Sequence, residues 1–485
     1  MNKVGKYIII SLLLLLGLCC VGVLYLFFVP NSDLFNITYL NNNITIESTK
    51  HEMDKISKIE LNSRAYNISV STTEDETIHA EVFSNSFGFV LTKNESAQVT
   101  SEIKNNVLTF NIKEPYGFAV KNNSLIKLYI PSSKSFDLTI NNKSAITTID
   151  SSALQINDLS YSTINGSINL KSGSVLKDMK INLNKGIFNV SETFVTSNND
   201  ITLKLTTGKL NAEHSVFGDI EILKNTRGVI KVKECVNLNE DISSAGGRID
   251  IDKVFDMHVI TSDSNIKVDE INGATITLTG SGNIDLGTTL GVTTLTTNSG
   301  NISIDKAESL LVLKTESGNI TVDSTKLSTS VSTEYGNIIV NFAEDAESYL
   351  DNKNSRVLYA RLKNGKLTAT GVEHIGSSKL STTSGIVVSE NGRINLKMNN
   401  VYGNNYIDGK NGDVKVTVNK ESVYVLTTST TSGSVRVNLT QIPEYRGYTT
   451  KDERETKVNC SSSSHNFKVS TNHGDLTVLD TNFAS

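Results

Sequence analysis

Five asparagines recur at a fixed interval of 18 residues, and this repeat constrains the fold of the 485-residue chain more than any other feature. Each follows a glycine or serine and opens the pattern Asn-Ile-x-[Val/Leu/Ile]: Asn265, Asn283, Asn301, Asn319 and Asn337. A chain that returns to the same chemistry at this interval, with no helical segment between, is expected to stack its coils about 4.8 Å apart, the strand spacing of a sheet. The sequence therefore predicts an all-β fold, a parallel β-solenoid.

Stacking places equivalent residues above one another, so we expect the asparagine column to hydrogen-bond from amide to amide along the axis. The residues before the asparagines are expected to form turns, with glycine at a backbone φ above zero where a Cβ would clash. These residues are Ser264, Gly282, Gly300, Gly318 and Gly336.

Alternating apolar and polar residues predict three inward-facing columns. They are Ile284, Ile302, Ile320 and Ile338; Leu286, Ile304, Val322 and Val340; and Leu295, Leu313 and Val331. A left-handed hexapeptide helix also has 18-residue coils, but it requires an aliphatic residue every six positions, which this chain lacks. A right-handed solenoid is therefore favoured.

Residues 7–29 form an unbroken apolar run, which as a helix would span roughly 34 Å and cross a bilayer core. Lys3 and Lys6 precede it and the next basic residue is Lys50, so the positive-inside rule predicts a cytoplasmic N-terminus and an extracytoplasmic bulk. We expect a single-pass signal-anchor in the cell membrane. Two alternatives are a cleavable signal peptide, whose apolar region is usually shorter, and a lipid on Cys19.

Pattern changes divide the chain into four parts. Residues 1–30 hold the cytoplasmic tip and transmembrane anchor, and residues 31–55 an Asn-rich stalk or linker. Between 56 and 140, alternating strands predict a β-rich region that caps the first coil, since an exposed edge offers unpaired N–H and C=O groups to other chains. Residues 141–485 are expected to form the solenoid.

Longer spacings between turn glycines predict two protrusions, near residues 341–356 and 441–462. The second contains Tyr445 and Tyr448. On a protruding loop, rigid aromatic faces can anchor a protein or glycan partner. The alternative is that these rings pack over loop bases or solenoid ends.

Ionisable residues show no catalytic, cofactor-binding or metal-binding pattern: the seven histidines lack paired ligand spacing, and Cys235 and Cys460 form no CxxC or Cys/His cluster. Four aspartates occupy one predicted corner: Asp252, Asp269, Asp305 and Asp323. Stacked carboxylates repel unless a cation intervenes, so a divalent ion is one interpretation and a solvated turn the other. The net charge of −5 with interspersed signs makes nucleic acid an unexpected partner.

The alternating N-terminal strands, the Leu-Tyr-Ile-Pro step at residues 128–131 and the repeated Ser-Gly-Asn-Ile turns resemble a bacterial, adhesin-labelled family of domains of unknown function. The resemblance covers most of residues 56–480 and implies a β-strand-repeat envelope protein without catalytic residues. Several coils depart from the usual turn: Ser264 replaces glycine, and Lys366 and Ile386 follow their glycines. Some members of the family look like sensors or regulators of envelope stress.

These observations predict a membrane-anchored envelope protein that presents a rigid extracytoplasmic solenoid for adhesion or scaffolding. We expect no enzyme activity and no cofactor. Its partners are the membrane, through residues 7–29, and an envelope, protein or glycan partner whose identity the sequence leaves open. A regulatory envelope-stress sensor and a β-helix carbohydrate-active enzyme remain alternatives. The enzyme would require a surface cluster of carboxylates that the sequence does not reveal.

Overall fold

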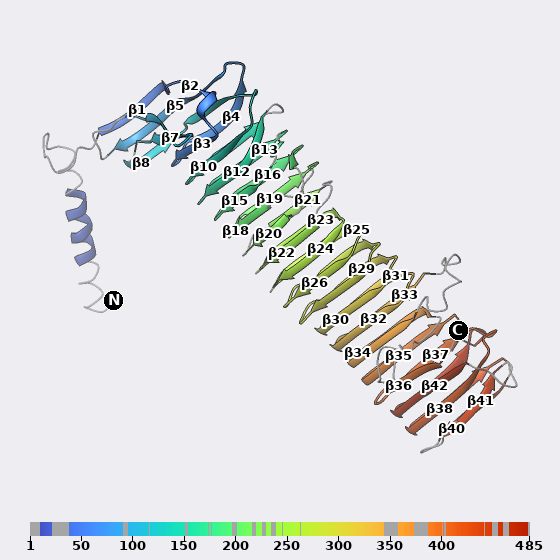
Figure 1. Cartoon of the computed structure of the whole chain (residues 1–485). Helices are drawn as coiled ribbons and strands as arrows, with labels where there is room; N and C mark the ends of the chain where they lie inside the picture. Colours follow the sequence, from blue (N-terminus) through green and yellow to red (C-terminus); the bar gives the residue numbers. More distant parts are fainter. Residues whose placement is uncertain are drawn as a thin grey trace. The chain divides into compact units, whose positions relative to one another are not determined.

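A computed structural model describes residues 10–21, 38–90, 96–115, 117–150, 154–172, 174–175, 177–195, 201–215, 220–225, 229–233, 239–244, 246–261, 263–343, 357–372, 387–399, 401, 404–440, 442–448, 454–458 and 465–483. These residues belong to two compact units, residues 1–176 (unit 1) and 177–485 (unit 2). Their regular structure is mainly β-strand, as Figure 1 shows. The predicted all-β class is confirmed.

The predicted anchor, residues 7–29, is described only in part: residues 10–21 form a helix with exposed side chains. Across the described ranges, no helix has the length and apolar character needed to span a bilayer. Residues 7–9 and 22–29 lie outside these ranges.

Unit 1 contains one short 3-10 helix, η1 (Met53–Lys55), among its strands. The strands are β1 (Thr38–Glu47), β2 (His51–Glu52), β3 (Lys58–Ser63), β4 (Asn67–Thr73), β5 (Thr77–Val90), β6 (Gln98–Lys104), β7 (Val107–Lys113), β8 (Gly117–Asn122), β9 (Leu125–Pro131), β10 (Phe136–Asn142), β11 (Ile146–Asp150), β12 (Gln155–Thr163), β13 (Ser167–Lys171) and β14 (Ser174–Val175).

Two parallel ladders build unit 1. In one, β7, β3, β10 and β12 lie side by side in that order; in the other, the order is β9, β4, β11 and β13. The coil β3–β4 is the first of these in the chain, yet it lies between the coils β7–β9 and β10–β11. Antiparallel strands β6 and β5 cover the outer edges of β7 and β9.

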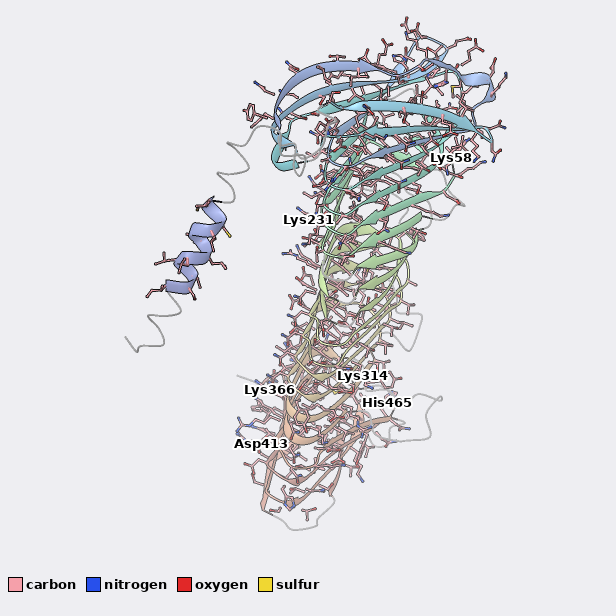
Figure 2. All side chains as sticks on the ribbon, turned by 90° about the vertical axis from the view of Figure 1, so that its left-hand side faces the viewer. Lys58, Lys231, Lys314, Lys366, Asp413 and His465 are labelled. Atoms are coloured by element: carbon pink, nitrogen blue, oxygen red, sulfur yellow. The ribbon has the colours of Figure 1, made fainter. Side chains whose placement is uncertain are left out.

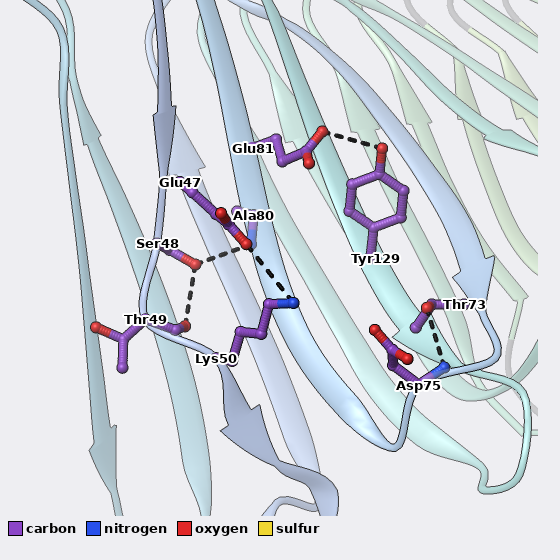
Figure 3. Close-up of polar contacts among 9 residues, drawn as sticks. All are labelled: Glu47, Ser48, Thr49, Lys50, Thr73, Asp75, Ala80, Glu81 and Tyr129. Carbon is purple, nitrogen blue, oxygen red and sulfur yellow. Dashed lines mark hydrogen bonds and ion pairs between the residues drawn. The ribbon is translucent and has the colours of Figure 1, made fainter.

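Strand β5 is held on both sides by polar contacts that Figure 3 draws. Tyr129 Oη on β9 donates to Glu81 Oε2 at 3.1 Å, and Ser48 Oγ accepts the Ala80 N–H at 2.9 Å. On the side away from β9, β5 pairs antiparallel with β1. Residues 38–47 of the predicted stalk are therefore a sheet strand rather than a linker, because the alternate residues Ile44 and Ile46 are partly buried.

Unit 2 contains strands β15 to β43. They are β15 (Met179–Leu183), β16 (Ile187–Ser191), β17 (Phe194–Val195), β18 (Ile201–Leu205), β19 (Lys209–Glu213), β20 (Ile220–Asn225), β21 (Val229–Lys233), β22 (Asn239–Ser244), β23 (Gly247–Val254), β24 (Asp256–Thr261), β25 (Ser264–Ile271), β26 (Thr275–Thr279), β27 (Ile284–Thr289), β28 (Thr293–Thr297), β29 (Ile302–Ala307), β30 (Leu311–Ser317), β31 (Ile320–Thr325), β32 (Thr329–Tyr335), β33 (Ile338–Phe342), β34 (Leu358–Val372), β35 (Val387–Met398), β36 (Asn404–Gly409), β37 (Val414–Val418), β38 (Tyr424–Ser432), β39 (Ser434–Leu439), β40 (Ile442–Tyr448), β41 (Arg454–Val458), β42 (Asn466–His473) and β43 (Leu476–Asp480).

Each coil of the strict repeat contributes one strand to each of two parallel sheets. Strands β25, β27, β29, β31 and β33 pair successively in one sheet, and β26, β28, β30 and β32 in the other. The longer β34 pairs with both β32 and β33, so it belongs to both sheets. The predicted parallel solenoid is therefore seen in unit 2, while its handedness stays a prediction.

The core of unit 2 consists of the predicted inward columns. Ile302 pairs with Ile284 and Ile320, and Leu313 with Leu295 and Val331, so like residues stack on like residues. All eleven residues of the three columns are at most 2% exposed. Burying an aliphatic side chain contributes about 1.5–3 kcal/mol before the opposing chain entropy is counted, so these columns are a large favourable term in folding.

At the C-terminal end of unit 2, the order of the coils differs from their order in the chain. Strand β42 pairs in parallel with β36 on one side and with β38 on the other. Strand β43 lies in the same way between β37 and β39. The coil that comes last in the sequence therefore lies between the two coils that precede it.

The predicted protrusion near 441–462 requires a correction. Its described residues form β40 and β41, which pair antiparallel with β39 and β38 of the outermost coil. They cover the last solenoid edge, because its N–H and C=O groups require partners. Pro443 and the charged residues of β41 disfavour further strand pairing. In the other predicted protrusion, near 341–356, residues 344–356 lie outside the described ranges.

Candidate functional site

The asparagine column forms a ladder, but of a different kind from the one predicted. The backbone N–H of Asn301 donates to Asn283 Oδ1 at 2.8 Å, and the N–H of Asn319 donates to Asn301 Oδ1 at 2.8 Å. The same bond links Asn283 to Asn265 at 3.0 Å and Asn337 to Asn319 at 2.8 Å. The column is thus bonded from side chain to main chain, because the turn leaves one backbone N–H per coil for the side chain of the coil below.

The ladder continues beyond the strict repeat. Lys366, labelled in Figure 2, donates its backbone N–H to Asn337 Oδ1 at 2.9 Å. Further along, Asp475 N–H donates to Asp413 Oδ1 at 3.1 Å, and Ser434 N–H donates to Asp475 Oδ1 at 2.9 Å. The bonds from the Ser434 side chain and backbone hold the pKa of the Asp475 carboxyl below its usual range.

Amide-to-amide bonds occur in other columns, which were not predicted from the sequence. In unit 2, Asn391 Nδ2 donates to Asn364 Oδ1 at 3.1 Å, and Asn411 Nδ2 to Asn391 Oδ1 at 2.9 Å. Each of these residues precedes a turn glycine, and this Asn-Gly dipeptide is the signal that could have revealed them. Their unequal spacing conceals them from a search at a fixed period.

We expect Asn301→Ala to destabilise unit 2 by about 1 kcal/mol, because it removes one acceptor and leaves the Asn319 N–H without its bond. Asn301→Asp should preserve most of the stability, since Asp413 and Asp475 perform this role elsewhere in unit 2. Calorimetric melting compares the variants. Equal melting temperatures for parent and Asn301→Ala would contradict a stabilising ladder.

Close approach requires glycine at every turn of the strict repeat that carries one, and backbone conformation requires it at one of them. Gly336 has the predicted positive φ, +157°, whereas Gly282, Gly300 and Gly318 are not among the positive-φ glycines. A Cβ on Gly300 would lie 1.9 Å from the Gly282 carbonyl oxygen, and one on Gly318 would lie 2.1 Å from that of Gly300. A Cβ cannot lie this close to an oxygen atom, so only glycine allows each coil to pack against the carbonyl group of the preceding coil.

A buried threonine three residues before each glycine completes the turn, and it was not among the residues predicted from the sequence. Thr297 Oγ1 accepts the Gly300 N–H at 3.1 Å and donates to the Gly282 carbonyl at 3.2 Å. Thr315 donates likewise to the Gly300 carbonyl at 3.0 Å. The signal is Thr-x-x-Gly, which recurs with the 18-residue period at Thr279, Thr297, Thr315 and Thr333.

The register places the four predicted aspartates at one corner of successive coils. Asp252 lies opposite Asp269 and Asp305 opposite Asp323, with Gly287 between the two pairs. Lysines accompany this corner: Lys267 Nζ lies 3.2 Å from Asp269 Oδ1. Within the described ranges, no group of three His, Cys, Asp or Glu side chains is placed to hold a metal ion.

A polar groove of about 340 Å³ lies on the sheet that contains β30, β32, β34 and β35. Its outward-facing walls are Lys314, Ser332 and Arg361 on one side and Glu316, Glu334, Lys363 and Glu390 on the other. Lys363 Nζ lies 3.7 Å from Glu334 Oε2, so part of the charge is already paired. The groove suits a polar, hydrogen-bonding ligand rather than an apolar one.

Tyr445 and Tyr448 lie on β40, where they pair with Val437 and Ser434 of β39. Their side chains lie outside the described part of the structure. The backbone places both residues in the strand that covers the outermost coil, not in an open loop.

Comparison with known proteins identifies the family. The family model described as Toastrack DUF4097 matches residues 56–252, 241–364 and 361–479. The chain belongs to this family. The three matches of the Toastrack model agree with the adhesin-labelled resemblance predicted from the turns. No curated protein matches the sequence.

Two solved structures are similar to this Toastrack chain. A candidate cell adhesion protein from Clostridium sporogenes has 11% identity and a TM-score of 0.23, over 50% of this chain and 99% of that one. A candidate adhesin from Bacteroides fragilis has 12% identity and a TM-score of 0.20, over 58% of this chain and 98% of that one. Both TM-scores lie below 0.5, and neither similarity supports a conclusion about function.

Proposed function

We propose that this Toastrack protein is a membrane-anchored cell-envelope protein that presents a rigid extracytoplasmic β-solenoid for adhesion or scaffolding, without catalysis. The observation that carries the proposal is the construction of unit 2. At its turns, Asn and Thr side chains hydrogen-bond to the backbone and Gly residues allow close approach of successive coils. Its core consists of stacked aliphatic columns. Such a frame holds its outward side chains at a regular spacing of about 4.8 Å, which suits the display of a binding surface.

The location rests on the sequence. The apolar residues 7–29, preceded by Lys3 and Lys6, favour a single-pass anchor with a cytoplasmic N-terminus. Within this proposal, the partner is a protein or glycan of the cell envelope. The polar groove around Arg361 and Glu334 and the end strand with Tyr445 and Tyr448 are its candidate contacts.

Protease treatment of intact cells tests the location. A chain with a C-terminal epitope tag should fractionate with membranes at full length and lose the tag to external protease. An internal cytoplasmic protein should survive as the control. A mature species that begins after residue 20, or a lipid on Cys19, would overturn the anchor.

Bead adherence tests the role. Beads coated with the purified protein should retain cells or isolated envelope material, and Arg361→Glu with Lys314→Glu should weaken this retention if the groove takes part. The matched control is Lys415→Glu, which changes an exposed residue of the same unit outside the groove. No retention above heat-unfolded protein would argue against adhesion and leave the sensor as the alternative.

A further inference from the structure

The C-terminal coil, formed by β42 and β43, occupies a slot between two coils that precede it in the sequence. Strands β36 and β37 form one wall of this slot, and β38 and β39 form the other. All four wall strands precede β42 and β43 in the sequence. Residues 466–480 are therefore the segment through which these two walls pair.

The contacts of the inserted coil are extensive on both walls. Phe467, Val469, Leu476 and Val478 are completely buried. Phe467 meets the Tyr424 ring edge-on at a centroid distance of 5.8 Å. Each wall therefore gains both sheet hydrogen bonds and apolar packing from the same short segment.

Polar side chains at the ends of the slot set its register. Asn466 Nδ2 donates to Asn404 Oδ1 at 2.9 Å, and Thr471 Oγ1 donates to the Gly412 carbonyl at 3.0 Å. Asp475 receives the Ser434 N–H from the other wall. A segment must carry this pattern of amide, hydroxyl and carboxylate groups to fill the slot, and residues 465–483 of any copy of the chain carry it.

We propose that residues 465–483 are an exchangeable pair of strands, and that the slot can be filled by the same segment from a second copy of this chain. The exchange makes every bond that the closed chain makes, so the two forms differ mainly in chain entropy. A tethered segment has an effective concentration in the millimolar range, which favours the closed form in dilute solution. Copies crowded at high local density approach this concentration and are then linked through their C-terminal ends.

Cysteine pairs in the full-length chain test the exchange, with serine replacing the natural cysteines at 19, 20, 235 and 460 in every variant. One copy carries Asn404→Cys and the other Asn466→Cys. These residues are paired in register, so their Cα atoms lie about 4.8 Å apart, within disulfide reach. Each copy alone lacks the second thiol, so this disulfide joins two copies only when one supplies β42 to the other.

The two copies are unfolded, refolded together at high concentration and oxidised, and mixed disulfide is measured on a non-reducing gel. A matched control replaces Asn404→Cys with Asp285→Cys, an exposed position outside the slot. We expect about tenfold more mixed disulfide from the slot pair than from the control pair, given the favourable effective concentration of a bound segment. Yields equal to the control would overturn the exchange.

A single chain with both Asn404→Cys and Asn466→Cys checks the geometry. It should form its internal disulfide and melt as cooperatively as the parent. Failure to form this bond would show that β42 does not occupy the slot, and the proposal would fall with it. None of these outcomes depends on membrane location or on adhesion.

Discussion

Gly318→Val is expected to destabilise unit 2 by at least about 3 kcal/mol, because its Cβ would overlap the Gly300 carbonyl oxygen. The overlap is with backbone, so no side chain can move aside to relieve it. Either the coils separate locally, which breaks sheet hydrogen bonds, or the Thr315 contact to the Gly300 carbonyl is lost. Differential scanning calorimetry should show a clearly lower melting temperature.

The matched control is Thr321→Val, which places the same side chain on the outward face of the same coil. Its effect should stay within about 0.5 kcal/mol, as for other surface changes. If Gly318→Val melts no lower than this control, the coils are not in the close contact described.

Glu114→Ala is expected to destabilise unit 1 by about 2–4 kcal/mol, because it removes one acceptor shared by a whole turn. Glu114 Oε1 accepts the backbone N–H of Arg64 at 2.6 Å and of Ala65 at 2.8 Å. It also accepts the Ser63 hydroxyl at 2.7 Å. The turn between β3 and β4 would lose these bonds together. Water can reach part of this turn and replace some of the bonds, which limits the loss of stability.

Hydrogen exchange of the Arg64 and Ala65 amides reports this loss directly, since both should exchange faster in the variant. Glu102→Ala on β6 is the control, because Glu102 is an exposed acidic residue of the same unit. Unchanged exchange in Glu114→Ala would show that water replaces the carboxylate at no cost.

The two predictions differ in how far the sequence alone could reach them. Gly318 belongs to a column with a constant period, so its neighbours in space are the residues 18 positions away. The sequence identified the column, although it assigned the wrong reason for glycine. Glu114 has no repeat partner, and its contact with Ala65 spans 49 positions. Nothing in its local sequence distinguishes it from the other glutamates of the chain.

The threonine and Asn-Gly columns could have been predicted from the sequence, although they were not. Thr-x-x-Gly recurs with the same period as the asparagines, so a search of all positions in the repeat would have included it. The Asn364, Asn391 and Asn411 ladder has unequal spacing because extra residues lie between its coils. Such insertions change the spacing of the asparagines in the sequence, but the coils still stack in register.

The sequence by itself determined the all-β class, the stacking of coils and the buried columns of unit 2, because a strict repeat converts distance in the chain into position in space. Only the tertiary structure decided the ends. It placed β42 and β43 between earlier coils and turned a predicted protrusion into the covering strands β40 and β41. The physical reason is that an edge strand accepts whichever segment satisfies its hydrogen bonds and covers its apolar face, and this competition among distant segments leaves no periodic trace in the sequence.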